Sequence, residues 1–214
     1  MIFLALFIIL FIISLVIKVY IYFAQKNYIL KNNKRELTGC ELAHEMLDKD
    51  SRTYILLTKG NSEYNSLRDT IKLDEYSFDE SSLYAIAVSA LKSYEAIDKK
   101  NSNVYKNRDK LSKLVFYMVV LSYIMIIMGP ILNEFTFSVI GIALITVVTL
   151  YDLYLINVYK NNIPKIVKNL SSNGLIDKDE KTDIKKCMEV ESLRSLTRLI
   201  SVINTLLDAL IPYE

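Results

Sequence analysis

Residues 114–151 read LVFYMVVLSYIMIIMGPILNEFTFSVIGIALITVVTLY, and Glu134 is the only charged side chain among them. A stretch of about 20 apolar residues is enough to cross a bilayer as a helix. The stretch therefore predicts two transmembrane helices, 114–132 and 135–157. The turn signals in 129–134, Gly-Pro and Asn-Glu, predict a very short connection between them. We expect the two helices to form an antiparallel hairpin.

A third apolar run lies at the N-terminus. Residues 1–17 carry no charged side chain, and Lys18 is the only one in 1–24, so we expect a transmembrane helix over 1–24. The alternative is a cleaved signal peptide, which would need a basic n-region and a small-residue cleavage site, and the run has neither. Uncharged runs of this length exclude a purely cytosolic protein, and the 52% hydrophobic content excludes a disordered chain.

Basic residues flank each run, at 26–35, 99–113 and 160–168, whereas the 130–134 turn has none. The positive-inside rule then places the N-terminus outside and the polar regions in the cytoplasm. We therefore expect a multi-pass protein of the cell membrane. The expected domains are a transmembrane helix (1–24), a cytoplasmic domain (25–113), a transmembrane helical hairpin (114–157) and cytoplasmic or membrane-associated C-terminal helices (158–214).

The charge balance and the cysteines exclude other classes of protein. The chain has 26 basic and 24 acidic side chains, a balance that gives no reason to expect a nucleic-acid partner. Two cysteines, Cys40 and Cys187, do not make a disulfide framework, and in the cytoplasm both should be free thiols. The high content of Asn, Ile, Lys and Tyr suggests an AT-rich bacterial genome.

The region 25–113 predicts a small α+β domain. Helical spacing, β-rich runs and turn residues predict a helix over 37–48, a strand over 53–58, a turn at 60–62, a second strand over 70–76 and a helix over 83–98 with one apolar face. Thr38 and Glu41 fit a capping box at the start of the first helix. The fold class we predict is an α+β membrane protein: a transmembrane helix, a helix/short-sheet/helix domain, a transmembrane hairpin and C-terminal helices.

The C-terminal region contains two further helical patterns. The charged run 177–186 predicts a solvated helix. Residues 193–211 have apolar side chains at helical spacing, which predicts a helix packed on the membrane domain or lying in the interface. A fourth span would have to place Arg198 and Asp208 in lipid. We interpret Asp152, inside the predicted third span, as part of a helix-packing polar cluster with Tyr151 and Tyr154.

Three segments of the polar domain resemble one known family. They are Leu37–Ala43 (LTGCELA), Leu73-Asp74-Glu75 and Ser82–Ala90 (SLYAIAVSA). In sequence and spacing they are similar to the LTGxEvA, L-S-E and S-I-x-A-I-A-V-A-A segments of the bacterial membrane-bound neutral zinc metallopeptidases (YugP-like). The resemblance implies a zincin-like helix that carries H-E-x-x-H, where two histidines bind zinc and the glutamate is the general base.

The residues of that motif are replaced in this chain. Leu91, Lys92 and Glu95 stand where the family has the first His, the Glu and the second His. Leu91 has no ligand atom, and the protonated Lys92 repels a cation and cannot act as a carboxylate base. The resemblance places the third, acidic ligand near Tyr159, where there is no acid. The family's Y-D-P is here Tyr64-Asn65-Ser66.

Little other chemistry is visible in the sequence. His44 is the single histidine and lies four residues after Cys40, a spacing that puts both on one helix face. Two ligands do not make a metal site, and we interpret the pair as structural. No G-x-S-x-G elbow and no Gly-rich phosphate loop is present.

We therefore expect a catalytically inactive, pseudopeptidase-like protein, not an enzyme, that has lost zinc and binds or regulates at the cytoplasmic membrane face. The expected binding surface is the old cleft around Leu91, Lys92, Tyr94 and Glu95, with the facing strand 53–58 holding an extended segment by β-addition. The partners would be the lipid bilayer and an intact paralogous peptidase or another membrane protein. Two alternatives stay open: an active hydrolase rebuilt from Cys40, His44 and Glu95, and a purely structural membrane subunit.

Overall fold

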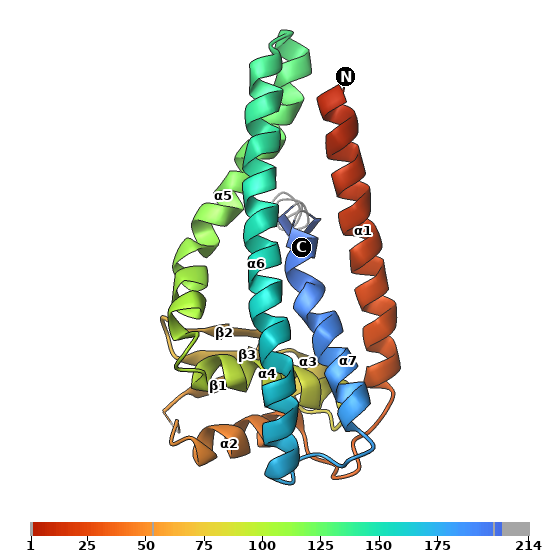
Figure 1. Ribbon diagram of the computed structural model, residues 1–214, viewed down its shortest axis with the longest axis vertical. Helices are drawn as coiled ribbons and strands as arrows, with labels where there is room; N and C mark the ends of the chain where they lie inside the picture. The colour runs from red at the N-terminus through yellow and green to blue at the C-terminus, as the bar shows by residue number, and fades with distance from the viewer. Residues whose placement is uncertain (1, 53, 199, 203–214) are drawn as a thin grey trace, which may run out of the picture. The chain divides into compact units, whose positions relative to one another are not determined.

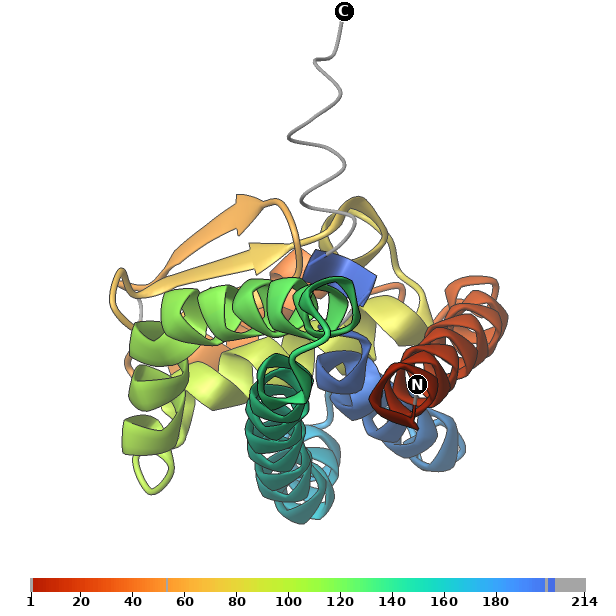
Figure 2. The ribbon, with the colours of Figure 1, turned by 90° about the horizontal axis from the view of Figure 1, so that it is seen from above.

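A computed structural model describes residues 2–52, 54–198 and 200–202 of the chain. These residues form two compact units, which are traced in Figures 1 and 2. Unit 1 contains the described residues of 1–21, 111–158 and 193–214, and unit 2 contains those of 22–110 and 159–192. The described residues are mostly helical, at 74% of the structure, with one small sheet.

Three helices are long and apolar enough to cross a membrane: α1 (Ile2–Ile29), α5 (Ser102–Leu132) and α6 (Phe135–Ser172). They contain the three predicted spans and support a membrane protein. Each helix continues beyond the span predicted within it, and α6 runs on through Pro164 to Ser172. The apolar character sets where a helix can cross a bilayer, but the helix itself ends only where its hydrogen bonding stops.

The connection between α5 and α6 consists of the two residues that the predicted spans, 114–132 and 135–157, leave between them. Only Asn133 and Glu134 lie outside the helices, with Asn133 at a φ of 54°, whereas Gly129 and Pro130 belong to α5. The prediction of a turn at Gly129-Pro130 is therefore wrong. A Cβ at Gly129 would lie 2.0 Å from Ser138 Oγ and 3.0 Å from Ser138 N, so this glycine lets the two helices of the hairpin approach closely.

Unit 1 also contains the start of the C-terminal segment. Leu193–Thr197 form a 3₁₀ helix, η1, and Ser14 on α1 donates a hydrogen bond to the Leu196 carbonyl (3.0 Å). The predicted helix over 193–211 lies mostly outside the described residues, including Asp208. The apolar core of this unit comes mainly from α5 and α6, through Val115, Val119, Tyr123, Ile126, Ile145 and Val148.

The sheet of unit 2 has three short strands, β1 (Leu56–Lys59), β2 (Glu63–Asn65) and β3 (Thr70–Leu73), in the order β1-β3-β2 (Figure 2, orange to yellow). β1 runs parallel to β3, and β2 runs antiparallel to it. The sequence predicted the first and last strands but not β2. The last strand ends at Leu73, because Asp74 begins the short helix α3 (Glu75–Phe78).

Helix α4 (Leu83–Ile97) is the centre of unit 2, packed against α2 (Gly39–Lys49) and α7 (Lys181–Ser192). Residues 83–91 are all buried, so α4 is enclosed on every side and not on one face as predicted. Helix α7 likewise buries Ile184, Cys187 and Met188, so the run 177–186 is only partly solvated.

The predicted helix starts of unit 2 are confirmed. Glu41 N donates to Thr38 Oγ1 (3.2 Å) and Thr38 N donates to Glu41 Oε2 (2.8 Å), which completes the capping box of α2. Ser82 caps α4 by accepting a hydrogen bond from Ala85 N (3.1 Å). These local bonds fix the residues at which α2 and α4 begin.

Candidate functional site

Two of the replaced motif residues form an ion pair on α4. Lys92 and Glu95 are three residues apart and share a helix face, with Lys92 Nζ 2.9 Å from Glu95 Oε1. Their side chains are 12% and 1% exposed. Leu91 is buried in the apolar core of unit 2, so it packs inside the domain and does not line a binding surface.

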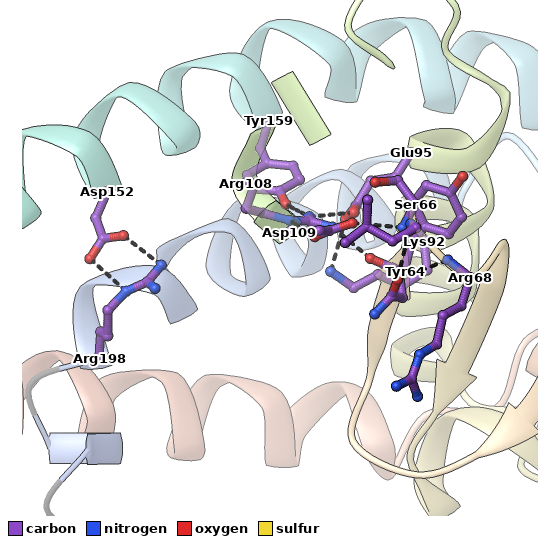
Figure 3. Close-up of polar contacts among 12 residues, drawn as sticks. Tyr64, Ser66, Arg68, Lys92, Glu95, Arg108, Asp109, Asp152, Tyr159 and Arg198 are labelled. Carbon is purple, nitrogen blue, oxygen red and sulfur yellow. Dashed lines mark hydrogen bonds and ion pairs between the residues drawn. The ribbon is translucent and has the colours of Figure 1, made fainter. Parts of the chain in front are cut away.

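Arg108, near the start of α5, binds the other oxygen of Glu95 (Figure 3). Its Nη1 lies 2.6 Å from Glu95 Oε2 and also donates to the Tyr159 hydroxyl at 2.7 Å. Its Nη2 donates to the Tyr64 carbonyl at 2.6 Å, and its Nε donates to Asp109 at 2.8 Å. All three guanidinium nitrogens therefore have partners, and they join α4, β2, α5 and α6.

Asp109 extends this cluster to the end of β2. One carboxylate oxygen of Asp109 accepts from Arg108, and the other accepts from the backbone N–H of Ser66 at 2.6 Å. The side chains of Arg108 and Asp109 are 16% and 11% exposed. The arrangement thus contains two cations and two anions, and each of them is bound to a group of opposite charge. We call Lys92, Glu95, Arg108, Asp109 and Tyr159 the α4 cluster.

The charges of the α4 cluster hold each other in the ionised state. Burial alone would raise the pKa of Glu95, but the charges of Lys92 and Arg108 and their hydrogen bonds outweigh it and lower the pKa of this carboxyl. Burial alone would lower the pKa of Lys92, but the carboxylate of Glu95 outweighs it and raises this pKa above its ordinary value. Lys92 is therefore an ammonium at neutral pH and has no lone pair to offer as a base.

The residues present do not fit a zinc ion. Zinc sites use imidazole, thiolate or carboxylate ligands. At the motif positions this chain has the aliphatic Leu91, the ammonium of Lys92 and Glu95, whose two oxygens already bind cations. Tyr159, near the expected third-ligand position, carries a hydroxyl that binds Arg108. Within 2–52, 54–198 and 200–202, no group of three or more His, Cys, Asp or Glu side chains could hold a metal ion.

The structure brings some of the predicted site residues together and separates others. Lys92, Glu95 and Tyr159 meet, and Lys92 Nζ also lies 5.7 Å from the centre of the Tyr159 ring. Tyr94 instead packs against the apolar core. The strands that pack against α4 are β2 and β3, so the facing strand is not the predicted 53–58; in that run, Thr53 lies outside the described residues.

Sequence reasoning missed Arg108 and Asp109. Arg108 stands among five lysines in the basic flank of the second span, which predicts only a cytoplasmic flank, and Asp109 was given no role. The sequence signal that could have identified them is their adjacency. An arginine next to an aspartate can be buried as an ion pair, whereas an isolated lysine near a span extends to the lipid headgroups. The contact of Arg108 with Tyr159 spans 51 residues of sequence, a separation that local patterns do not reveal.

The thiols and the histidine do not form a second site. Cys40 is partly buried and His44 is exposed, both on α2, whereas Cys187 is buried in the core of unit 2. Burial raises the pKa of the Cys187 thiol well above its ordinary value. Glu95 has both oxygens engaged by cations, so the alternative of a hydrolase rebuilt from Cys40, His44 and Glu95 has no support in this geometry.

Asp152 has a specific partner within unit 1. It is 3% exposed and accepts two hydrogen bonds from Arg198, at 2.8 and 3.2 Å (Figure 3). A polar cluster at Asp152 was predicted, but Tyr154 is exposed and does not belong to it. The ion pair explains how an arginine and an aspartate are both tolerated in an apolar unit.

A hollow of about 240 Å³ adjoins the α4 cluster. Its lining includes Glu95 and Tyr105, the Tyr64 and Ser66 end of β2, and the exposed Lys106. The hollow is therefore polar and charged, and Glu95 is one of the residues in its wall.

A family model described as "Putative neutral zinc metallopeptidase" matches residues 3–213, which is nearly the whole chain. No curated protein and no solved structure matches the chain. The match agrees with the resemblance of the segments at Leu37–Ala43 and Ser82–Ala90, and it extends that resemblance across the apolar helices. On this evidence the chain belongs to the family of neutral zinc metallopeptidases.

Proposed function

We propose that this protein is a catalytically inactive member of its family that binds an extended segment of a partner protein and does not cut it. The observation that carries the proposal is the state of Glu95. Its two oxygens are bound by Lys92 and Arg108 at 2.9 and 2.6 Å, on the helix that should carry the catalytic motif.

The chemistry of a zinc peptidase has no support from these side chains. That reaction needs a metal to activate water and polarise the carbonyl, and a base to take a proton from the water. The base position is an ammonium, Lys92, and the one remaining carboxylate, Glu95, is neutralised twice. Two buried cations in the same place also oppose the entry of a divalent metal ion.

The binding role rests on β1. This strand is at one end of the sheet. Leu56 N donates to the Asp69 carbonyl just before β3 at 3.0 Å, and Gly60 N, just after β1, donates to the Leu73 carbonyl of β3 at 2.9 Å. Because backbone groups alternate along a strand, the N–H groups of Leu57 and Lys59 point to the outer edge. Tyr54 and Leu56, each 60% exposed, offer apolar contacts beside that edge. An extended segment can add there by β-augmentation.

The membrane helices and the flanking basic residues favour a place at the cytoplasmic face of the cell membrane. A membrane-anchored binding protein meets partners in the same bilayer most often. The partner we propose is accordingly another membrane protein, such as a relative with an intact H-E-x-x-H motif.

Inactivity is tested on the full chain purified in mild detergent. We expect substoichiometric zinc, and the same background hydrolysis of unstructured casein in the wild type and in Glu95→Gln, both assayed below their melting temperatures. One zinc per chain together with hydrolysis that Glu95→Gln abolishes would contradict the proposal.

Binding is tested by mass spectrometry of what copurifies from native membranes. Lys59→Pro removes an outward N–H of β1 without removing a bond to β3, and Lys59→Ala is the matched control because it also loses the ion pair with Asp79. We expect a stoichiometric membrane partner with the wild type and Lys59→Ala, and its loss with Lys59→Pro. Equal recovery with all three, or no partner with any, would count against β1 as the binding strand.

A further inference from the structure

The outer edge of β2 is occupied by side chains of the same protein. β2 pairs with β3 through Glu63↔Lys72, Tyr64↔Ile71 and Asn65↔Thr70. The Tyr64 carbonyl accepts from Arg108 Nη2, and two residues later Ser66 N donates to Asp109. A strand added to this edge would donate an N–H to the Tyr64 carbonyl and accept from the Ser66 N–H. Arg108 and Asp109 occupy these two positions instead.

Arg108 makes more contacts than its hydrogen bond to the edge of β2. Its guanidinium also contacts the Glu95 carboxylate and the Tyr159 hydroxyl, and its central carbon lies 5.6 Å from the centre of the Tyr105 ring. A carboxylate, a hydroxyl and a backbone carbonyl around one planar cation, with an aromatic ring nearby, are the groups that recognise arginine in proteins.

The charge of these groups favours a cation in that position. Lys92 alone cannot neutralise both Glu95 and Asp109, whose side chains are 1% and 11% exposed. Without Arg108 the α4 cluster would have one uncompensated negative charge away from water, which is a costly state. The carboxylate and the hydroxyl bind Nη1, whereas the carbonyl binds Nη2. A compact ammonium has a single nitrogen in place of this planar fork, so we expect it not to satisfy all three groups.

From this geometry we propose that Glu95, Tyr159 and the Tyr64 carbonyl form a guanidinium-binding site, filled by Arg108 of the same chain. With Asp109 on Ser66, its occupation keeps the outer edge of β2 closed to an added strand. The ligand class of the former motif region is therefore a guanidinium and not a divalent metal. This inference stands apart from the proposed function, because it does not depend on whether β1 binds a partner.

The test is chemical rescue of Arg108→Ala in the full chain in detergent. Loss of the buried pair should lower the melting temperature by about 10 °C. Ethylguanidinium, a small cation with the missing group, should enter through the adjoining hollow and restore about half of that loss at millimolar concentration. Ethylammonium and zinc chloride should restore none. Arg68→Ala, which removes an exposed arginine of the same unit, is the control and should melt as the wild type with or without additives.

Each outcome decides the proposal. Equal recovery with ethylammonium, recovery with zinc, or no recovery with ethylguanidinium overturns it. If Arg108→Ala does not fold, Arg108→Lys keeps the charge but not the shape, and amide hydrogen exchange measures the edge directly. The Ser66 N–H should then exchange at least about tenfold faster than in the wild type, since β2 loses its cover. Unchanged protection of Ser66 in Arg108→Lys would also overturn the proposal.

Discussion

Glu95→Gln should lower the stability of the protein strongly. In an active enzyme the opposite is common, because a catalytic carboxylate lowers the stability of the fold and its removal raises it. The change removes the anion that two buried cations share. Lys92 and Arg108 are 12% and 16% exposed, and Asp109, the partner of Arg108, would be the one carboxylate left in the α4 cluster. Breaking a buried pair from one side costs about 3–5 kcal/mol, and for a chain of this size that corresponds to a melting temperature lower by about 10 °C.

The size of the effect should depend on which partner is removed. Lys92→Met leaves Glu95 bound to Arg108, so we expect a smaller loss, about 1–3 kcal/mol. In the double variant Lys92→Met/Glu95→Gln the remaining Arg108 and Asp109 still balance each other. The double variant should therefore lose less stability than the two single variants added together, by roughly 1 kcal/mol or more.

A thiol-reactive dye gives the readout, because Cys187 is buried in the core of unit 2 and becomes reactive only when that unit unfolds. A Cys40→Ser background removes the second thiol. The reasoning is refuted if Glu95→Gln melts at or above the wild-type temperature, or if the single-variant losses are strictly additive.

Four further results are expected. The cations around Glu95 lower its pKa. Its contribution to stability is therefore present above the unfolded pKa of about 4.5 and is lost as pH falls through the folded pKa. In a plot of melting temperature against pH, Glu95→Gln should lose less stability on acidification than the wild type, and an equal loss would contradict this. Asp152→Leu should destabilise unit 1 in detergent melts by leaving Arg198 unpaired, and Asp152→Leu/Arg198→Met should recover most of the loss; no recovery would exclude the pair as the cause. Gly141→Ala should cost about 1–3 kcal/mol, because its Cβ would lie 2.8 Å from the Ser122 carbonyl oxygen; a wild-type melting temperature would show that the hairpin is packed less closely. Cys187 should react with maleimide only after denaturation, because it is buried with a raised pKa; fast labelling of the folded protein would show that the core of unit 2 is open.

The parts of the fold that local sequence decides were predictable. The capping box at Thr38 and Glu41 needs only residues three apart, and the apolar spans need only composition. Strand β2 escaped prediction because three residues, Glu63–Asn65, are too few to show an alternating pattern. Gly129 was misread because a glycine that permits close helix packing and a glycine that makes a turn look alike in sequence.

The candidate site was predictable in position but not in chemistry. The resemblance led to Lys92, Glu95 and Tyr159, and these side chains do lie together in unit 2. It could not show that Arg108 lies between Glu95 and Tyr159, because that contact depends on tertiary packing of α4, α5 and α6. The replacement of a metal motif by a balanced ion-pair cluster becomes visible only when the partners of each charge are known.

Zinc titration of the purified wild type, after removal of bound metal with a chelator, tests most directly whether the former motif region has lost its metal. Calorimetry at neutral pH should show no zinc binding that depends on Glu95, so the wild type and Glu95→Gln should give the same trace. One zinc ion bound per chain in the wild type, and lost in Glu95→Gln, would mean that Glu95 leaves its two cations for a metal, and would contradict an inactive protein whose α4 cluster is closed to zinc.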